Sequence, residues 1–171
     1  MDDLLLNSNS TLVIGKYSEK RLSISNKIAN KIVSLNNIET IYKEIDEKNM
    51  STLLENQKKN SKPVLLHLNI LRISEILDNL KLIIYNARHL NIFIVMAINE
   101  QVHLKPEIRV NMDLVITCKE TEYYIIKKIY CYFGVIETIK KFENLIKNID
   151  ENVILCLNKN KINTYNLASL K

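Results

Sequence analysis

The chain has 171 residues, of which 47% are hydrophobic and 25% are charged. That length and balance predict one globular domain with a sizeable core, and exclude a disordered or collagen-like chain. The net charge of +5 is compatible with a nucleic-acid partner, because basic side chains neutralise phosphates. The lysines are spread along the chain among Asp and Glu, however, so the charge alone does not locate a basic face.

The cysteines and the lengths of the apolar runs indicate in which compartment the protein is expected. Cys118, Cys131 and Cys156 lie far apart, without a zinc-type spacing, so no metal site is expected. Cys118 and Cys156 fall inside apolar runs, which favours buried thiols in a reducing compartment. The acidic start at Met1 argues against a signal peptide. The apolar run 93–98 is too short to cross a bilayer, so no membrane partner is expected.

Apolar runs and helical spacings alternate along the chain, and the two glycines, Gly15 and Gly134, each follow a predicted element. In the first half we predict a strand over 11–14, a helix over 23–35, a short edge strand within 38–45, a helix or loop over 50–59, a buried strand over 63–68 and a helix over 73–84 with Ser74 as a possible cap. In the second half we predict strands over 92–98, 114–118 and 153–157, and helices over 121–133 and 138–149.

Strands that alternate with amphipathic helices predict βαβ units. The expected fold class is therefore α/β, a three-layer sandwich with a mainly parallel sheet and helices on both faces. Residues 1–158 are expected to form the domain, and residues 159–171 a polar C-terminal tail.

The region from 84 to 113 carries a specific arrangement of polar residues. Arg88 and His89 precede the apolar run 92–98, Asn99 follows it, and the loop beyond reads Pro106-Glu-Ile-Arg109-Val-Asn-Met-Asp113. In this order the residues resemble the DNA-packaging ATPases of large cytoplasmic DNA viruses, within the FtsK–HerA group of P-loop motors. The resemblance extends from about residue 12 to about residue 158 and implies a P-loop NTPase-like fold.

A strand that runs into Gly15 and then a helix is where a phosphate-binding loop belongs. That loop requires G-x-x-x-x-G-K-[ST], so that backbone N–H groups wrap the phosphates, Lys pairs with them and the hydroxyl holds magnesium. Here Gly15 fits the first glycine, whereas Lys20 falls on the second glycine, Arg21 on the lysine and Leu22 on the hydroxyl residue. A one-residue deletion would instead put Lys20 on the lysine and Arg21 on the hydroxyl residue, and neither alignment restores the motif.

Two interpretations of this segment stay open. One is a loose phosphate site built from Gly15, Lys16, Lys20 and Arg21, with Ser23 offering a hydroxyl one position late. The other is a relic loop with a solvated charge cluster.

The resemblance also implies a pair of acids at the end of the strand over 63–68. Asn69 takes the first position and carries no charge for Mg²⁺, and Ile70 cannot act as a base. His67 alternates with buried residues and is interpreted as a hydrogen-bonded core histidine. Without either partner of the metal site we expect little or no ATP hydrolysis.

Three positions that are polar in the family are also polar in this sequence. Asn99 stands where the family has a Gln that senses the γ-phosphate, although Asn is also a common turn residue. Arg88 and Arg109 are candidates for an arginine finger that reaches a neighbouring subunit's nucleotide. The alternative for both arginines is pairing with carbonyls or carboxylates of their own chain.

These patterns together predict a degenerate, non-hydrolysing member of the viral DNA-packaging ATPase family, which acts in genome packaging or virion assembly. The alternatives are an active motor subunit with a diverged nucleotide site and a basic nucleic-acid-binding module. No cofactor is expected, although ATP with Mg²⁺ is the one that the family implies. The implied partners are packaging-ATPase-like subunits, in a homo- or hetero-oligomer, and double-stranded DNA. The implied location is the host cytoplasm or the virion.

Overall fold

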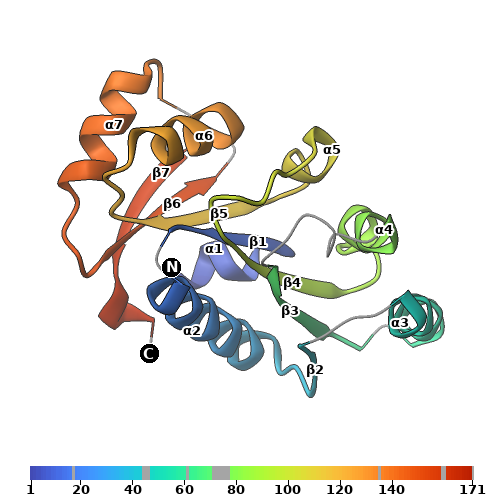
Figure 1. The fold of residues 1–171 in the computed structure, drawn as a ribbon. Helices are drawn as coiled ribbons and strands as arrows, with labels where there is room; N and C mark the ends of the chain where they lie inside the picture. The colour runs from blue at the N-terminus through green and yellow to red at the C-terminus, as the bar shows by residue number, and fades with distance from the viewer. Residues whose placement is uncertain are drawn as a thin grey trace.

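A computed structural model of the chain describes residues 1–16, 18–43, 47–60, 62–70, 78–134, 136–158 and 161–170. These residues form one seven-stranded sheet in the order β2-β3-β4-β1-β5-β6-β7 (Figure 1). The strands are β1 (Ser10–Ile14), β2 (Thr40–Tyr42), β3 (Val64–Ile70), β4 (Ile92–Ile98), β5 (Leu114–Cys118), β6 (Val153–Asn158) and β7 (Lys161–Asn166).

The sheet is parallel from β2 to β5 and continues with two antiparallel strands, β6 and β7. The two strands beside β1, β4 and β5, are buried at every position, and Thr117 is their one polar residue. Continuous apolar runs of this kind are stable only when both faces of the sheet are covered. The predicted mainly parallel α/β sheet is confirmed.

Helices cover both faces, as Figure 1 shows. They are α1 (Asp2–Leu6), α2 (Ser18–Asn36), α3 (Glu47–Lys59), α4 (Asp78–Asn86), α5 (Pro106–Arg109), α6 (Tyr123–Phe133) and α7 (Ile139–Asn148), with a short 3₁₀ helix η2 (Leu167–Ser169). Helices α1 and α2 pack on one face through Leu5, Ile24 and Ile28. Helices α3, α4, α6 and α7 pack on the other face, where Phe142 of α7 is fully buried.

The structure differs from the sequence expectations in two places that matter below. Helix α2 begins at Ser18, five residues before the predicted start. Residues 161–166, expected within a polar tail, form the edge strand β7 instead. The backbone of β6 pairs with this segment along its length, and Ile162 and Tyr165 pack against opposite cores. The predicted cap Ser74 lies outside the described residues.

The path of the chain creates a switch point at β1. After β1 the chain enters α2 on one face, and after β5 it enters α6 on the other. In open α/β sheets, ligands bind in the crevice that such a divergence leaves at the carboxyl ends of the strands. Within the described residues, no helix is both long enough and apolar enough to span a bilayer.

Candidate functional site at the carboxyl end of strand β1

The connection between β1 and α2 is very short. Strand β1 ends at Ile14 and α2 begins at Ser18, so Gly15, Lys16 and one further residue separate them. A Cβ atom on Gly15 would lie 3.8 Å from the Cys118 Sγ, which is an ordinary contact. The fold at this position therefore does not depend on glycine.

Arg21 occupies the crevice from the first turns of α2. The residue is 2% exposed, and its Nη1 donates a hydrogen bond to the Gly15 carbonyl oxygen over 2.8 Å. Its buried Nε has no hydrogen-bond partner. Burial lowers the pKa of the Arg21 guanidinium, and the negative charge of Glu100 opposes that effect. Arg21 is thus a buried cation that donates a hydrogen bond within its own chain.

Glu100 is a functional candidate that the sequence reasoning missed. It lies just beyond the end of β4, and its Oε2 is buried without a hydrogen-bond partner. Lys128 of α6 donates a hydrogen bond to the Glu100 backbone carbonyl. Burial lowers the pKa of Lys128, and Glu100 again opposes the shift. The sequence did contain an indication of this residue. Glu100 is a carboxylate close behind the buried strand β4, which pairs with β1.

The lysines at the rim of the crevice are paired with carboxylates of their own chain. Lys16 lies 3.2 Å from Glu122 at the start of α6. Lys20 lies 3.0 Å from Glu151, and Lys119 contacts the same side chain over 3.4 Å. The hydrogen bond from Lys20 lowers the pKa of Glu151, with further contributions from the charges of both lysines. These pairs connect the β1–α2 segment and α2 with the β5–α6 and α7–β6 loops.

The other predicted phosphate-site and metal-site residues do not join this cluster. Ser23 is exposed on α2, away from buried Arg21. Asn69 is exposed on β3, and β4 separates that strand from β1. His67 forms a 2.7 Å hydrogen bond with the Ser25 hydroxyl, as the interpretation of a core histidine predicted. Burial lowers the pKa of His67, and the positive charge of Lys43 adds to the shift.

Asn99 has the geometry of a turn residue. Its side-chain oxygen accepts hydrogen bonds from the backbone N–H groups of Gln101, over 3.0 Å, and Val102, over 3.1 Å. An Asn that binds the backbone two residues ahead stabilises a turn. This side chain therefore orders the loop that carries Glu100.

The two arginine-finger candidates lie apart from the crevice. Arg88 is at the amino edge of the sheet, where it contacts Asp113 over 3.0 Å and has a 66% exposed side chain. The other Asp113 oxygen accepts hydrogen bonds from the backbone N–H groups of Asn9 and Ser10, which fixes the start of β1. The guanidinium of Arg109 lies 4.1 Å from the centre of the Tyr132 ring of its own chain. The finger role stays a prediction for both.

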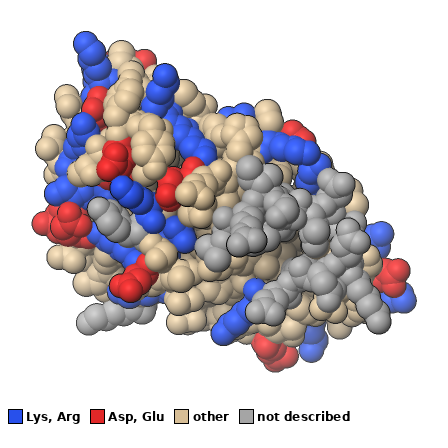
Figure 2. All heavy atoms as spheres, viewed as in Figure 1, with Lys and Arg blue, Asp and Glu red and all other residues tan. Residues whose placement is uncertain are grey.

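Positive charge is interleaved with negative charge on the surface. Figure 2 shows Lys and Arg side chains over α6 and α7 with acidic side chains among them. Two pairs at α7 illustrate this pattern: Lys141 with Glu137, which precedes the helix, at 2.7 Å, and Lys147 with Glu143 at 2.6 Å. Exposed pairs of this kind are weak and do not amount to a uniform basic face.

Comparisons with known proteins identify the fold. No protein-family model matches the sequence, and no curated protein matches it. Among solved structures, the genome packaging NTPase B204 from Sulfolobus turreted icosahedral virus 2, in complex with ATP-gammaS, superposes with a TM-score of 0.66. The match covers 92% of this chain and 96% of that one at 11% identity. The chain has the fold of a genome-packaging NTPase.

Two further structures share this packaging-NTPase fold. B204 from Sulfolobus turreted icosahedral virus, a DNA-packaging ATPase, gives a TM-score of 0.63 at 14% identity, over 92% of this chain and 96% of that one. ATPases 2 and 3 of EssC from Geobacillus thermodenitrificans give 0.60 at 12% identity, over 94% of this chain and 39% of that one. The P-loop NTPase-like fold that the sequence resemblance implied is confirmed.

Proposed function

We propose that this protein is a non-hydrolysing relative of the viral DNA-packaging ATPases that acts in genome packaging or virion assembly through contacts with other subunits and DNA. The observation that carries the proposal is the engagement of Arg21. This arginine stands at the position of the catalytic lysine, yet it is buried in α2 and bound to the Gly15 carbonyl. A phosphate-binding lysine instead presents its charge to the ligand.

The geometry of the β1–α2 connection supports the proposal. Backbone N–H groups can wrap a phosphate only from a loop long enough to curve around it. Here three residues connect β1 and α2, and Lys20 and Arg21, which match the second glycine and the lysine of the motif, already belong to α2. The residues of this segment do not fit the phosphates of ATP.

The surrounding charges support it further. The rim lysines Lys16 and Lys20 are paired with their own carboxylates, and Glu100 adds negative charge beside the place where a polyanion would lie. Asn69, at the position of the strand-end acid, carries no charge to hold Mg²⁺. We therefore assign no cofactor.

The proposed partners are packaging-ATPase-like subunits, in a homo- or hetero-oligomer, and double-stranded DNA, in the host cytoplasm or the virion. The structures that share the fold include a DNA-packaging ATPase. Arg88 is the better candidate for reaching a neighbouring subunit, because its side chain is 66% exposed at the amino ends of the strands. Arg109 is stacked on its own Tyr132.

The nucleotide part of the proposal is tested by melting the protein with and without millimolar Mg-ATP. Ligand at 100 times its Kd stabilises a protein by about 2.7 kcal/mol, which is several degrees in Tm for a domain of this size. We expect no shift and no phosphate release above the spontaneous rate. A shift of several degrees that disappears in the Lys20→Ala variant would instead establish a working, diverged nucleotide site.

The DNA part is tested separately by fluorescence anisotropy with a double-stranded oligonucleotide. We expect binding that weakens steeply between 50 and about 200 mM salt, as counterion release requires, and that Mg-ATP leaves unchanged. Absence of binding at low salt would remove DNA from the proposal and leave the protein partners. Binding that Mg-ATP strengthens would contradict the non-nucleotide role.

A further inference from the structure

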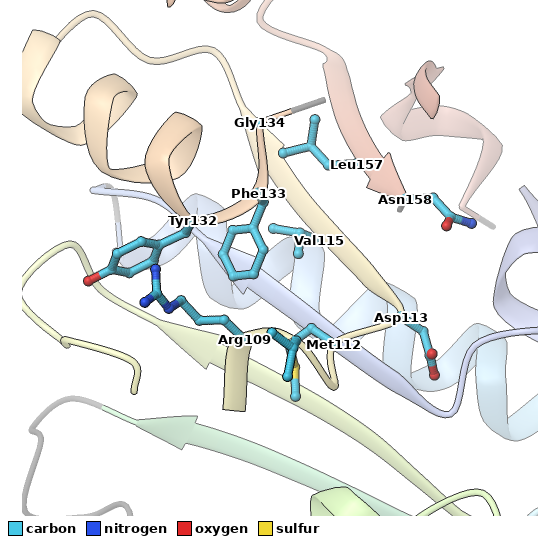
Figure 3. Close-up of a pocket in the computed structure, with 10 residues that line it drawn as sticks. Arg109, Met112, Asp113, Val115, Tyr132, Phe133, Gly134, Leu157 and Asn158 are labelled. Atoms are coloured by element: carbon cyan, nitrogen blue, oxygen red, sulfur yellow. The ribbon is translucent and has the colours of Figure 1, made fainter. Parts of the chain in front are cut away.

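A second hollow lies beneath the C-terminal end of α6, away from the crevice. The cavity has a volume of about 240 Å³ and is lined by residues of α5, β5, α6 and β6. Figure 3 shows Met112, Val115 and Phe133 facing one another in it, with Leu157 above them. One wall of the cavity is therefore apolar.

The polar feature of this cavity is Arg109. Figure 3 shows its side chain extending to the ring of Tyr132, where the guanidinium carbon lies 4.1 Å from the ring centre. Its Nε is buried without a hydrogen-bond partner. Within the part of the chain that the structure describes, the Arg109 side chain makes no hydrogen bond or ion pair. Stacking on a ring engages the face of a guanidinium and leaves the donors along its edge available.

The carboxylate that lines the cavity does not satisfy Arg109. Asp113 Oδ1 is 3.0 Å from Arg88, and Asp113 Oδ2 accepts hydrogen bonds from Asn9 and from the backbone and side chain of Ser10. Its charge is thus balanced from outside the cavity. The charge at the cavity that has no ion-pair partner among the described residues is that of Arg109.

We propose that this cavity binds a small organic carboxylate with an apolar body. The carboxylate would take the edge of the Arg109 guanidinium in a bidentate pair, which is the geometry that arginine favours. The apolar body would fill the space between Val115, Phe133 and Leu157. At ~30 Å³ per water-sized group, the cavity holds roughly eight non-hydrogen atoms. The inference goes beyond the proposed function, because this cavity and the β1–α2 crevice share none of these residues.

The test is a titration with phenylacetate, followed by the methyl NMR signals of Val115 and Leu157, with the isosteric neutral phenylacetamide alongside. We expect phenylacetate to shift both signals and to bind about tenfold or more tightly than the amide, since the charged hydrogen bonds are lost with the amide. Equal binding of the acid and the amide, or no shift of these signals, would overturn the proposal.

Variants separate the role of Arg109 from a general effect of charge. Arg109→Gln should lose the preference for the acid, whereas Lys105→Gln, which removes an exposed cation just before α5, should keep it. An unchanged preference in Arg109→Gln would contradict the proposal.

Val110 lines the cavity and is 66% exposed, so its substitution leaves the fold intact. At low salt, affinity for phenylacetate should fall in the order Val110→Lys, wild type, Val110→Asp, and identical affinities would also overturn the proposal.

The same chemistry is available from a free metabolite or from the end of a partner's chain. Acetyl-Gly-Gly-Phe with a free carboxylate distinguishes these sources when it is compared with its carboxamide. A peptide acid that binds at least as tightly as phenylacetate assigns the cavity to a chain terminus. A peptide acid that fails to bind, while phenylacetate binds, assigns it to a small molecule.

Discussion

Arg21 and Arg109 each place a guanidinium beside the central sheet, but in opposite surroundings. Arg21 is almost fully buried, donates to the Gly15 carbonyl and faces the charge of Glu100. Arg109 lies against Tyr132 at a cavity, and its side chain makes no hydrogen bond or ion pair among the described residues. The guanidinium of Arg21 therefore has a hydrogen-bond acceptor in its own chain, and that of Arg109 has none within the part of the chain that the structure describes.

The same contrast extends to the charges around them. The rim of the crevice pairs Lys16 and Lys20 with carboxylates that come from distant parts of the chain. At the cavity, Asp113 is engaged by groups at the amino edge of the sheet, and no carboxylate is left for Arg109. A positive residue in a sequence motif can thus be engaged by carboxylates of its own chain, as Lys16 and Lys20 are.

The largest expected effect comes from removing the buried arginine. Arg21→Ala leaves the Gly15 carbonyl without its donor and takes one positive charge away from Glu100. Glu100 keeps the charge of Lys128 nearby, so the unpaired carbonyl and the lost Arg21 charge set the cost. We expect a loss of about 2–4 kcal/mol in the free energy of unfolding, measured by urea denaturation. Lys20→Ala is the matched control and should cost less than about 0.5 kcal/mol, because its pair with Glu151 is partly exposed. Equal costs would mean that Arg21 is not part of the core.

The next largest effect on stability is expected from alanine substitutions at the two glycines. A Cβ on Gly134 would lie 2.5 Å from the Tyr130 carbonyl oxygen and 2.6 Å from its ring, whereas one on Gly15 meets Cys118 at 3.8 Å. Gly134→Ala should therefore cost about 1–3 kcal/mol through overpacking, and Gly15→Ala should be neutral within about 0.5 kcal/mol. Thermal unfolding measures both. A costly Gly15→Ala would show that the crevice loop is more constrained than the cavity wall.

The smallest expected effect is a dependence of folding stability on pH, which arises from His67 on β3. Burial lowers the pKa of His67 in the folded state, so the unfolded chain takes up the proton first. The stability from the neutral ring is complete above an unfolded pKa of about 6.5 and is lost as pH falls towards the folded value. Melting temperatures should decline over this window, and His67→Gln should flatten the decline. His89→Gln, which changes an exposed histidine, should leave it as steep as in the wild type.

Local pattern in the sequence predicted much of this fold. The apolar runs at 92–98 and 114–118 match β4 and β5 residue for residue, because a strand covered on both faces has few polar positions. The edge strand β7 was not predicted, since an edge strand can be polar and is stabilised by backbone pairing. The early start of α2 was missed because Ser18, Glu19 and Lys20 carry no apolar stripe.

The site was less predictable than the fold. The importance of positions 15, 21 and 99 followed from motif spacing, but their partners did not, because they lie on other elements. Lys20 and Glu151 are 131 residues apart, and Arg88 and Asp113 meet only through the packing of the amino edge. The cavity is lined by four separate elements, so no local pattern in the sequence could indicate it.

The strand order has a consequence for how the chain reaches this state. Strand β1 is made first, yet its two neighbours are β4 and β5, and Ser10 pairs with Ile94. Contacts so distant in sequence slow folding, because the loop must close before any pairing stabilises it. During synthesis β1 therefore has no strand to pair with until more than half of the chain has been made. Over that interval its apolar residues, among them Leu12 and Val13, are exposed to aggregation.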